Sequence, residues 1–170
     1  FDTSGHRLAA LKPRLARSGL SNVYPVQIAH ERDERIKRLA GKIDRVLVDA
    51  PCSGLGTLRR NPDLKWRQTP QAIDELRAKQ AAILASAARL VKPGGRLVYA
   101  TCSLLREENE AIAQAFGEAQ KDAFRPLPVE ELLAAAHVAG GAELVREGFL
   151  RLWPQRHGTD GFFAAAWQKI

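Results

Sequence analysis

The chain has 170 residues, of which 45% are hydrophobic, and its 26 lysines and arginines against 19 aspartates and glutamates give a formal net charge of +7. This length allows one domain with its own core, and the positive charge favours a polyanionic partner such as nucleic acid. No apolar run reaches membrane-spanning length and the first residues lack the order of a signal peptide, so we expect a cytoplasmic protein that contacts no membrane. The 2 cysteines stand far apart, which gives neither a zinc-binding spacing nor a disulfide framework, and we expect no metal.

Strands and helices are expected to alternate along the first part of the chain. Residues 1–2 are interpreted as the end of a strand, and Ser4 can cap a helix over residues 5–18. A strand is expected at residues 23–28, followed by a highly charged loop or short helix. The β-branched run in residues 44–48 predicts a buried central strand.

The middle of the chain repeats this alternation. Thr69 and Pro70, with acids soon after, predict the start of a helix that ends before the Lys-Pro-Gly-Gly break at residues 92–95. An apolar strand is expected at residues 96–100 and another helix at 107–118. This order predicts an α/β fold with a largely parallel sheet that is covered by helices.

The last part of the chain is expected to form a short helix and then a hairpin. Residues 129–139 predict the helix, and the Gly-Gly pair after it predicts a break. Residues 149–153 and 161–167 are apolar runs that we expect to pair as an antiparallel hairpin. Residues 154–160 would form its loop.

Residues with reactive side chains follow two of the expected strands. Asp49-Ala50-Pro51-Cys52-Ser53 follows one strand and Thr101-Cys102-Ser103 follows another, so both cysteines occupy equivalent positions. Ligands bind at the carboxyl ends of strands in open α/β sheets, which predicts that both thiols open into one crevice. The alternatives are buried cysteines of the ordinary kind and an Asp49 carboxylate satisfied by loop N–H groups.

A basic and aromatic segment follows Cys52. Arg59, Arg60, Lys65 and Trp66 combine cationic groups, which suit phosphate contacts, with an indole ring, which suits stacking on a base. Their position beside the thiols favours RNA contact over the alternative of a solvated charged loop.

These motifs resemble a known family. DAPCSGLG with RRNPDLKW, and PGGRLVYATCS with REENE, are similar to the two cysteine motifs of the RNA cytosine-5 methyltransferases, above all the Sun/Fmu (RsmB) type that modifies small-subunit ribosomal RNA. The resemblance extends from Asp2 to the terminal DGFFAAAW. It implies a Rossmann-like class I methyltransferase sheet, largely parallel with a C-terminal antiparallel hairpin, and S-adenosyl-L-methionine as the cofactor.

The resemblance also implies what is missing and what each residue does. The family's first strand and AAPGGKT-like glycine-rich loop have no counterpart, so residues 1–170 are expected to be the C-terminal portion of a catalytic domain, incomplete for cofactor binding. Cys102 would be the nucleophile and Cys52 would assist product release. Asp49 would contact the cytosine and border the cofactor, Asp2 would hold the ribose hydroxyls, and His30 stands where the family usually has an acid that contacts the adenine amino group.

The chemistry explains why a thiol is required. Carbon 5 of cytosine is a poor nucleophile until a thiolate adds to carbon 6, and residue types alone do not decide which cysteine adds. Three alternatives remain: a non-catalytic RNA-binding protein or fragment with this fold, a tRNA cytosine-5 methyltransferase, and an amino-methyltransferase. The last normally has a D/N-P-P-Y/F strand end, which Ala50-Pro51-Cys52 does not match.

Overall fold

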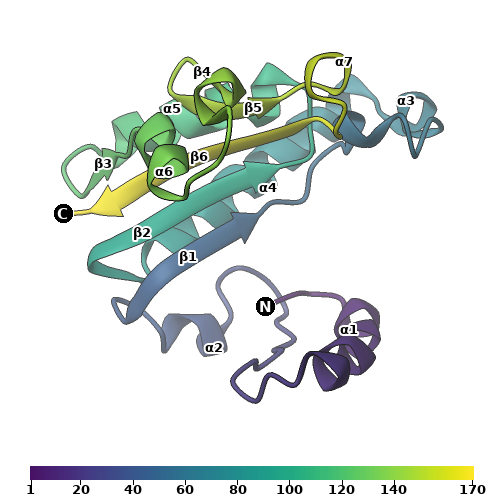
Figure 1. The fold of residues 1–170 in the computed structure, drawn as a ribbon. Helices are drawn as coiled ribbons and strands as arrows, with labels where there is room; N and C mark the ends of the chain where they lie inside the picture. The colour runs from purple at the N-terminus through teal and green to yellow at the C-terminus, as the bar shows by residue number, and fades with distance from the viewer. The chain divides into compact units, whose positions relative to one another are not determined.

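A computed structural model describes all 170 residues, which divide into two compact units, residues 1–39 and 40–170 (Figure 1). In the first unit, α1 (Gly5–Ser18) begins where it was predicted, because the Ser4 hydroxyl accepts the Arg7 N–H over 3.2 Å. The second helix of this unit, α2 (Glu34–Lys37), is capped by Asp33. The predicted strand at residues 23–28 is wrong. Asp2 is the one residue that pairs with this segment, so Gln27 forms only an isolated parallel bridge and no strand results.

The second unit is built on a six-stranded sheet with the order β1-β2-β6-β5-β4, in which β3 also pairs with β6. β1 and β2 are parallel, and β6 runs antiparallel to β2, β3 and β5. The α/β class with antiparallel C-terminal strands is therefore confirmed, although β6 gives the sheet more antiparallel pairings than the sequence suggested. The strands are β1 (Ile43–Asp49), β2 (Val91–Thr101), β3 (Phe124–Pro126), β4 (Val145–Arg146), β5 (Phe149–Leu152) and β6 (Phe162–Lys169).

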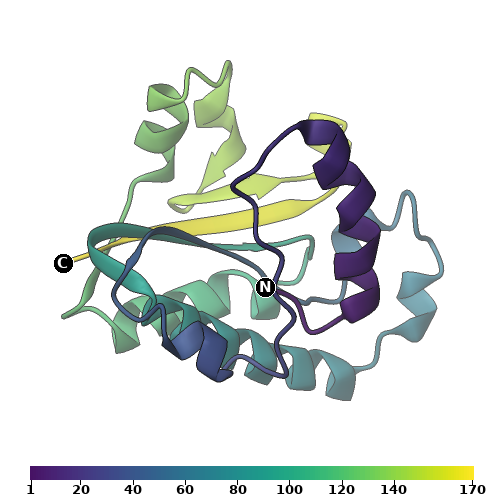
Figure 2. The same cartoon turned by 90° about the horizontal axis from the view of Figure 1, so that it is seen from below.

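Helices cover one face of the sheet. α4 and α5 contact each other and lie together against the strands (Figure 2). α4 begins as predicted, since the Thr69 hydroxyl accepts the Ala72 N–H over 3.1 Å. The helical segments of this unit are η1 (Leu55–Thr57), α3 (Leu64–Arg67), α4 (Pro70–Ala88), η2 (Arg106–Glu108), α5 (Glu110–Ala119), α6 (Val129–Ala135), η3 (Gly141–Leu144) and α7 (Pro154–His157).

The helix predicted at residues 107–118 begins later than expected. Residues 106–108 form the 3₁₀ turn η2, and α5 starts only at Glu110. The cause is the burial of Glu108 and Asn109, whose side chains bond to the strand ends instead of facing solvent at the first turn of a helix. The sequence predicted a helix from residue 107, and these tertiary contacts delay its start to Glu110.

The core lies between the sheet and α4 and α5. Alternate residues of β2, Leu97 and Tyr99, are fully buried on this face, as the two-residue period of a strand requires. The Phe116 ring of α5 packs edge-on against Trp167 of β6, with ring centroids 4.8 Å apart. No helix in the chain has both the length and the apolar character needed to cross a membrane.

Candidate active site

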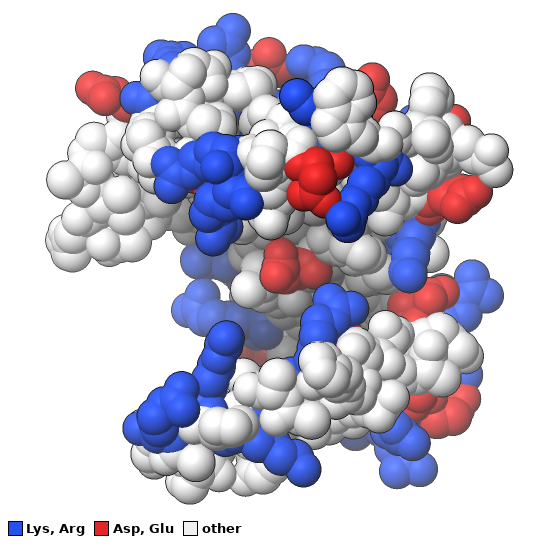
Figure 3. Space-filling model, turned by 90° about the vertical axis from the view of Figure 1, so that its right-hand side faces the viewer, with Lys and Arg blue, Asp and Glu red and all other residues white.

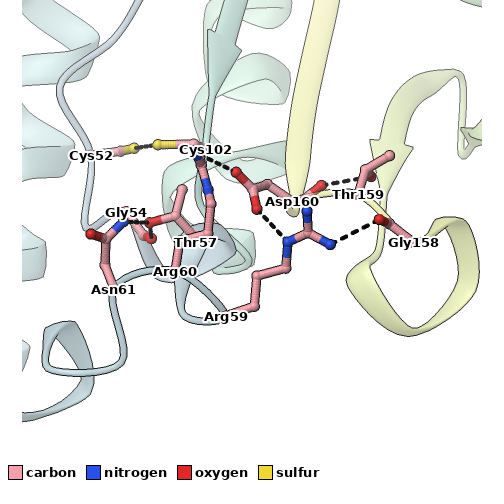
Figure 4. A network of polar contacts seen from close by, with 10 residues as sticks. All are labelled: Cys52, Gly54, Thr57, Arg59, Arg60, Asn61, Cys102, Gly158, Thr159 and Asp160. Atoms are coloured by element: carbon pink, nitrogen blue, oxygen red, sulfur yellow. Dashed lines mark hydrogen bonds and ion pairs between the residues drawn. The ribbon is translucent and has the colours of Figure 1, made fainter.

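The two cysteines meet at the carboxyl ends of β1 and β2. Asp49 lies opposite Ala100 in the parallel register, and the Ala50 N–H donates to the Ala100 carbonyl over 2.9 Å, so the two strands end at the same level. The Sγ atoms of Cys52 and Cys102 are therefore only 3.5 Å apart, and both thiols are free (Figure 4). This confirms that the strand ends bring both thiols to one place.

The two thiols have opposite pKa shifts. The hydrogen bond from the Cys52 thiol lowers the pKa of Cys102 to about 7, although burial and the negative charges of Asp49 and Glu108 oppose this shift. The same hydrogen bond, together with burial, raises the pKa of Cys52. A thiolate is the nucleophilic form of cysteine, and the direction of these shifts makes Cys102 the more acidic thiol of the pair.

Two glycines join the loops around the thiols. The Gly56 N–H donates to the Cys102 carbonyl, and the Gly161 N–H donates to the Gly56 carbonyl, each over 2.8 Å. A Cβ atom on Gly56 would lie 2.3 Å from the Gly161 carbonyl oxygen and 2.7 Å from that of Cys102. The close approach that the Gly54-Leu55-Gly56 sequence permits is thus to the protein's own backbone.

A buried polar cluster lies behind the thiols. Glu108 is fully buried, and its carboxylate accepts hydrogen bonds from Ser53, Ser103 and Gln80. Beside it, the Asn109 amide accepts from the Thr101 hydroxyl and donates to the Ser103 carbonyl over 3.0 Å. The residues that flank both cysteines are therefore held from within the protein.

The two arginines predicted to bind RNA are paired with an acid. Arg59 Nε lies 2.8 Å from Asp160 Oδ1, and Arg60 bonds to the other oxygen of the same carboxylate (Figure 4). Arg59 also donates to the Gly158 carbonyl over 2.8 Å. Burial alone would raise the pKa of Asp160, but the hydrogen bonds from Arg60 and Arg59 outweigh it and lower this pKa. Both arginine side chains remain more than half exposed.

Lys65 and Trp66 form an exposed cation–π pair. Trp66 in α3 is 80% exposed, and the Lys65 ammonium lies 4.8 Å from the centroid of its ring. Seen from the side of α3 and α7, the surface carries many Lys and Arg side chains (Figure 3). An exposed indole of this size has no packing role in the described chain.

Asp2 and His30 lie in the first unit. Asp2 is partly exposed, and its Oδ1 accepts the Ser4 N–H over 2.7 Å and lies 3.4 Å from Arg7. His30 is exposed, and its Nδ1 accepts the Arg32 N–H over 3.1 Å. The chain contains no group of three or more His, Cys, Asp or Glu residues arranged to hold a metal ion.

Sequence reasoning assigned no role to four residues, Glu108, Asn109, Gln80 and Asp160, although the first two lie in the REENE motif. A signal was present for two of them, because an acid and an amide stand side by side five residues after a strand-end Thr-Cys-Ser. Gln80 looked like an ordinary helix residue, and Asp160 like a residue of a hairpin loop. Their partners lie 28 and 100 positions away, so only the folded chain reveals these roles.

The sequence and the fold match those of known methyltransferases. The model of the family described as "16S rRNA methyltransferase RsmB/F" matches residues 1–168, and the chain belongs to this family. Among solved structures, that of PH0851 is 36% identical with a TM-score of 0.84, over 99% of this chain and 36% of that one. NSun6 from Pyrococcus horikoshii with SFG is 27% identical with a TM-score of 0.75, over 99% of this chain and 40% of that one.

Relatives named methyltransferase F and relatives named methyltransferase B match this chain about equally well. The "Ribosomal RNA small subunit methyltransferase F" of Escherichia coli O9:H4 (strain HS) is 40% identical over 98% of this chain and 33% of its own length. The "Probable ribosomal RNA small subunit methyltransferase B" of Synechocystis sp. is 41% identical over 99% of this chain and 36% of its own length. The chain thus spans about a third of the length of these relatives.

Proposed function

We propose that this chain carries the thiol centre of an enzyme that methylates carbon 5 of a cytosine in small-subunit ribosomal RNA. The observation that supports this most directly is the Cys52–Cys102 pair, with its sulfur atoms 3.5 Å apart and the pKa of Cys102 lowered to about 7. Methylation of an exocyclic nitrogen requires no thiolate, whereas activation of carbon 5 does. The matches to small-subunit rRNA methyltransferases favour ribosomal RNA as the substrate.

In this proposal the two cysteines act in sequence. The Cys102 thiolate forms a bond to carbon 6, and the electrons of the 5,6 double bond become available at carbon 5 for methylation. A base then removes the proton from carbon 5, the double bond re-forms and the bond from sulfur to carbon 6 breaks. Cys52 is adjacent to the sulfur that must leave, which suits a role in this release. Asp49, exposed at the end of β1, would hold the cytosine.

S-adenosyl-L-methionine would supply the methyl group as an electrophilic sulfonium. Asp2 fits a contact with its ribose, because this partly exposed carboxylate stands at a bridge between two chain segments and can accept hydroxyl protons. His30 offers an exposed ring for the adenine, and Asp49 is the candidate cofactor contact that the second unit supplies. The relative NSun6 was solved with SFG, an S-adenosylmethionine analogue, which supports the same cofactor here.

The RNA would reach the thiols across the basic segment after Cys52. Arg59, Arg60 and Lys65 would contact phosphates, and the exposed Trp66 would stack on a base. The target cytosine has to leave its stack to reach thiols that are partly buried, which favours single-stranded or flipped RNA. Two free thiols so close together also suit the reducing conditions of the cytoplasm.

Covalent trapping tests this function and the division of roles. The complete enzyme that contains this chain is incubated with S-adenosylmethionine and RNA that carries 5-fluorocytosine, and adducts are resolved on a denaturing gel. Wild-type protein should form an adduct, because fluorine at carbon 5 prevents the final elimination. Cys102→Ala should form no adduct and should not methylate ordinary RNA, since carbon 6 has no nucleophile.

Cys52→Ala is the matched variant, because it removes the other thiol of the pair. It should still form the adduct and should accumulate it with ordinary RNA, since addition survives while elimination slows. Trapping by Cys102→Ala but not by Cys52→Ala would reverse the two roles. Methylation of an exocyclic nitrogen instead of carbon 5, detected by mass spectrometry of nucleosides, would overturn the proposed function.

A further inference from the structure

Glu108 is a buried acid without a cationic partner. It is 0% exposed, and the groups that bond to it are neutral: the Ser53 N–H at 2.9 Å, the Gln80 amide at 3.0 Å, and the hydroxyls of Ser53 and Ser103. A buried carboxylate is costly unless its oxygens are well supplied with donors. The chain provides four donors to these two oxygens, which indicates that the carboxylate has a structural role at this position.

The two serines have a specific relation to the thiols. Ser53 follows Cys52 directly, and Ser103 follows Cys102 directly. Both hydroxyls donate to the same oxygen, Glu108 Oε2, and the two Oγ atoms are 3.1 Å apart. Each serine is joined through the backbone to the cysteine before it. Holding the two serine hydroxyls together therefore limits how far apart the two cysteines, and their sulfur atoms, can move.

We infer that Glu108 is a positioning residue that sets the distance between Cys52 and Cys102 by holding Ser53 and Ser103 together. Neighbouring contacts act in the same direction, since Gln80 donates to the Pro51 carbonyl and Gln68 to the Ser53 carbonyl, each over 2.9 Å. Without Glu108 the loop after β1 would lose the side-chain link from Ser53 to Ser103 and would keep the Gly56 N–H bond to the Cys102 carbonyl.

A carboxylate suits this position better than any other side chain. Its two oxygens can accept all four hydrogen bonds, whereas an amide would present an NH₂ group to two of these partners, and the two serine hydroxyls could then only accept from it. Hydrogen bonds to a charged acceptor are also stronger than those to a neutral one. The expected order of positioning is therefore Glu, then Gln, then Ala.

The effective concentration of one thiol at the other measures this distance without RNA or cofactor. The protein is equilibrated with glutathione and glutathione disulfide, so that Cys52 and Cys102 lose two electrons and two protons to form a disulfide while one glutathione disulfide is reduced to two thiols. The oxidised fraction is read by mass spectrometry after alkylation. Glu108→Ala should lower the effective concentration about tenfold or more, and Glu108→Gln should lie between Ala and the wild type.

Two sets of variants separate positioning from folding. Glu107→Ala removes the exposed acid next to Glu108 and should leave the effective concentration unchanged. The double variant Ser53→Ala with Ser103→Ala keeps the carboxylate and removes only the hydroxyls, and it should lower the effective concentration as well. If circular dichroism shows that Glu108→Ala does not fold, the inference is tested with this double variant alone.

A residue that only stabilised the fold would lower the unfolding temperature and leave the thiol pairing of the folded protein unchanged. An unchanged or increased effective concentration in folded Glu108→Ala, or in the double serine variant, would overturn the inference. An equal loss in Glu107→Ala would do the same. The consequence for catalysis rests on the proposed function, but the measurement does not: thiols positioned by Glu108 in a protein that fails to methylate would refute the function alone.

Discussion

Gly161 donates its backbone N–H to the Gly56 carbonyl over 2.8 Å, and the two residues approach so closely that neither can carry a side chain. A Cβ on Gly56 would lie 2.3 Å from the Gly161 carbonyl oxygen, and one on Gly161 would lie 2.9 Å from the Gly56 Cα. This contact joins the loop after β1 to the start of β6, at the level of the thiols.

Gly56→Ala should therefore destabilise the protein. The new methyl group would force two backbone segments apart, and we expect the free energy of unfolding to fall by about 1–3 kcal/mol. Urea unfolding followed by tryptophan fluorescence measures this change. Gly117→Ala is the control, because its Cβ would meet only Trp167 Nε1, at 3.7 Å, and alanine favours the helix α5. Equal stability of both variants would contradict the expectation.

The low pKa of Cys102 should depend on the Cys52 thiol. The rate of Cys102 alkylation by iodoacetamide should rise with pH around a midpoint of about 7 in the wild type. Cys52→Ala removes the donor that stabilises the thiolate, so this pKa should rise and alkylation at pH 7 should slow about tenfold. Cys52→Ser keeps an O–H donor and should retain most of the rate.

Asp49→Asn should shift the pKa of Cys102 in the opposite direction. The negative charge of Asp49 raises the pKa of Cys102, so its removal should lower that pKa further. The measurement is the same pH series, with the peptide that contains Cys102 quantified by mass spectrometry. Identical midpoints in the wild type, Cys52→Ala and Asp49→Asn would show that neither group controls the thiol.

Asp160→Asn should strengthen the binding of RNA. The change releases Arg59 and Arg60 from their shared carboxylate and removes a negative charge from the proposed RNA path. We expect affinity for single-stranded RNA to rise several-fold, with a steeper dependence on salt concentration, as measured by fluorescence anisotropy. Asp74→Asn is the matched control, because Asp74 is also paired with an arginine, Arg77, in α4. Weaker RNA binding by Asp160→Asn would show that the ion pairs hold the arginines in place for RNA.

Trp66→Ala should weaken RNA binding without affecting stability. The ring is 80% exposed, so its loss removes little buried area, whereas stacking on a base contributes about 1–3 kcal/mol per base. Titration of single-stranded RNA, read by anisotropy, should show about a tenfold or greater loss of affinity. Trp66→Phe should recover part of it. Unchanged affinity would remove Trp66 from the proposed interface.

The sequence by itself determined the local elements and the strand ends. The Thr69-Pro70 helix start, a strand that ends at Asp49 and the terminal hairpin follow from capping, β-branched runs and turn residues, which act within a few positions. The prediction that this strand is central and buried was wrong, because β1 lies at the edge of the sheet and only its Val48 is buried. The convergence of the two cysteine motifs was also predicted from the sequence, because similar patterns at two strand ends come together in a parallel pair. These features depend on local conformational preferences, which are set by residues close together in the sequence.

Only the tertiary structure decided which groups complete the site. Glu108 and Asn109 were expected in the first turn of a helix, yet they are buried and hydrogen-bonded at the strand ends, and α5 begins only at Glu110. Residues 23–28 have a strand-like sequence, but a strand exists only where a neighbour pairs with it, and here Asp2 alone does. The pairing of Arg59 and Arg60 with Asp160 was equally invisible in the sequence. Hydrogen bonds and ion pairs between distant positions form only when the fold brings the groups together, so the support of the thiols is a property of the folded chain and not of its local pattern.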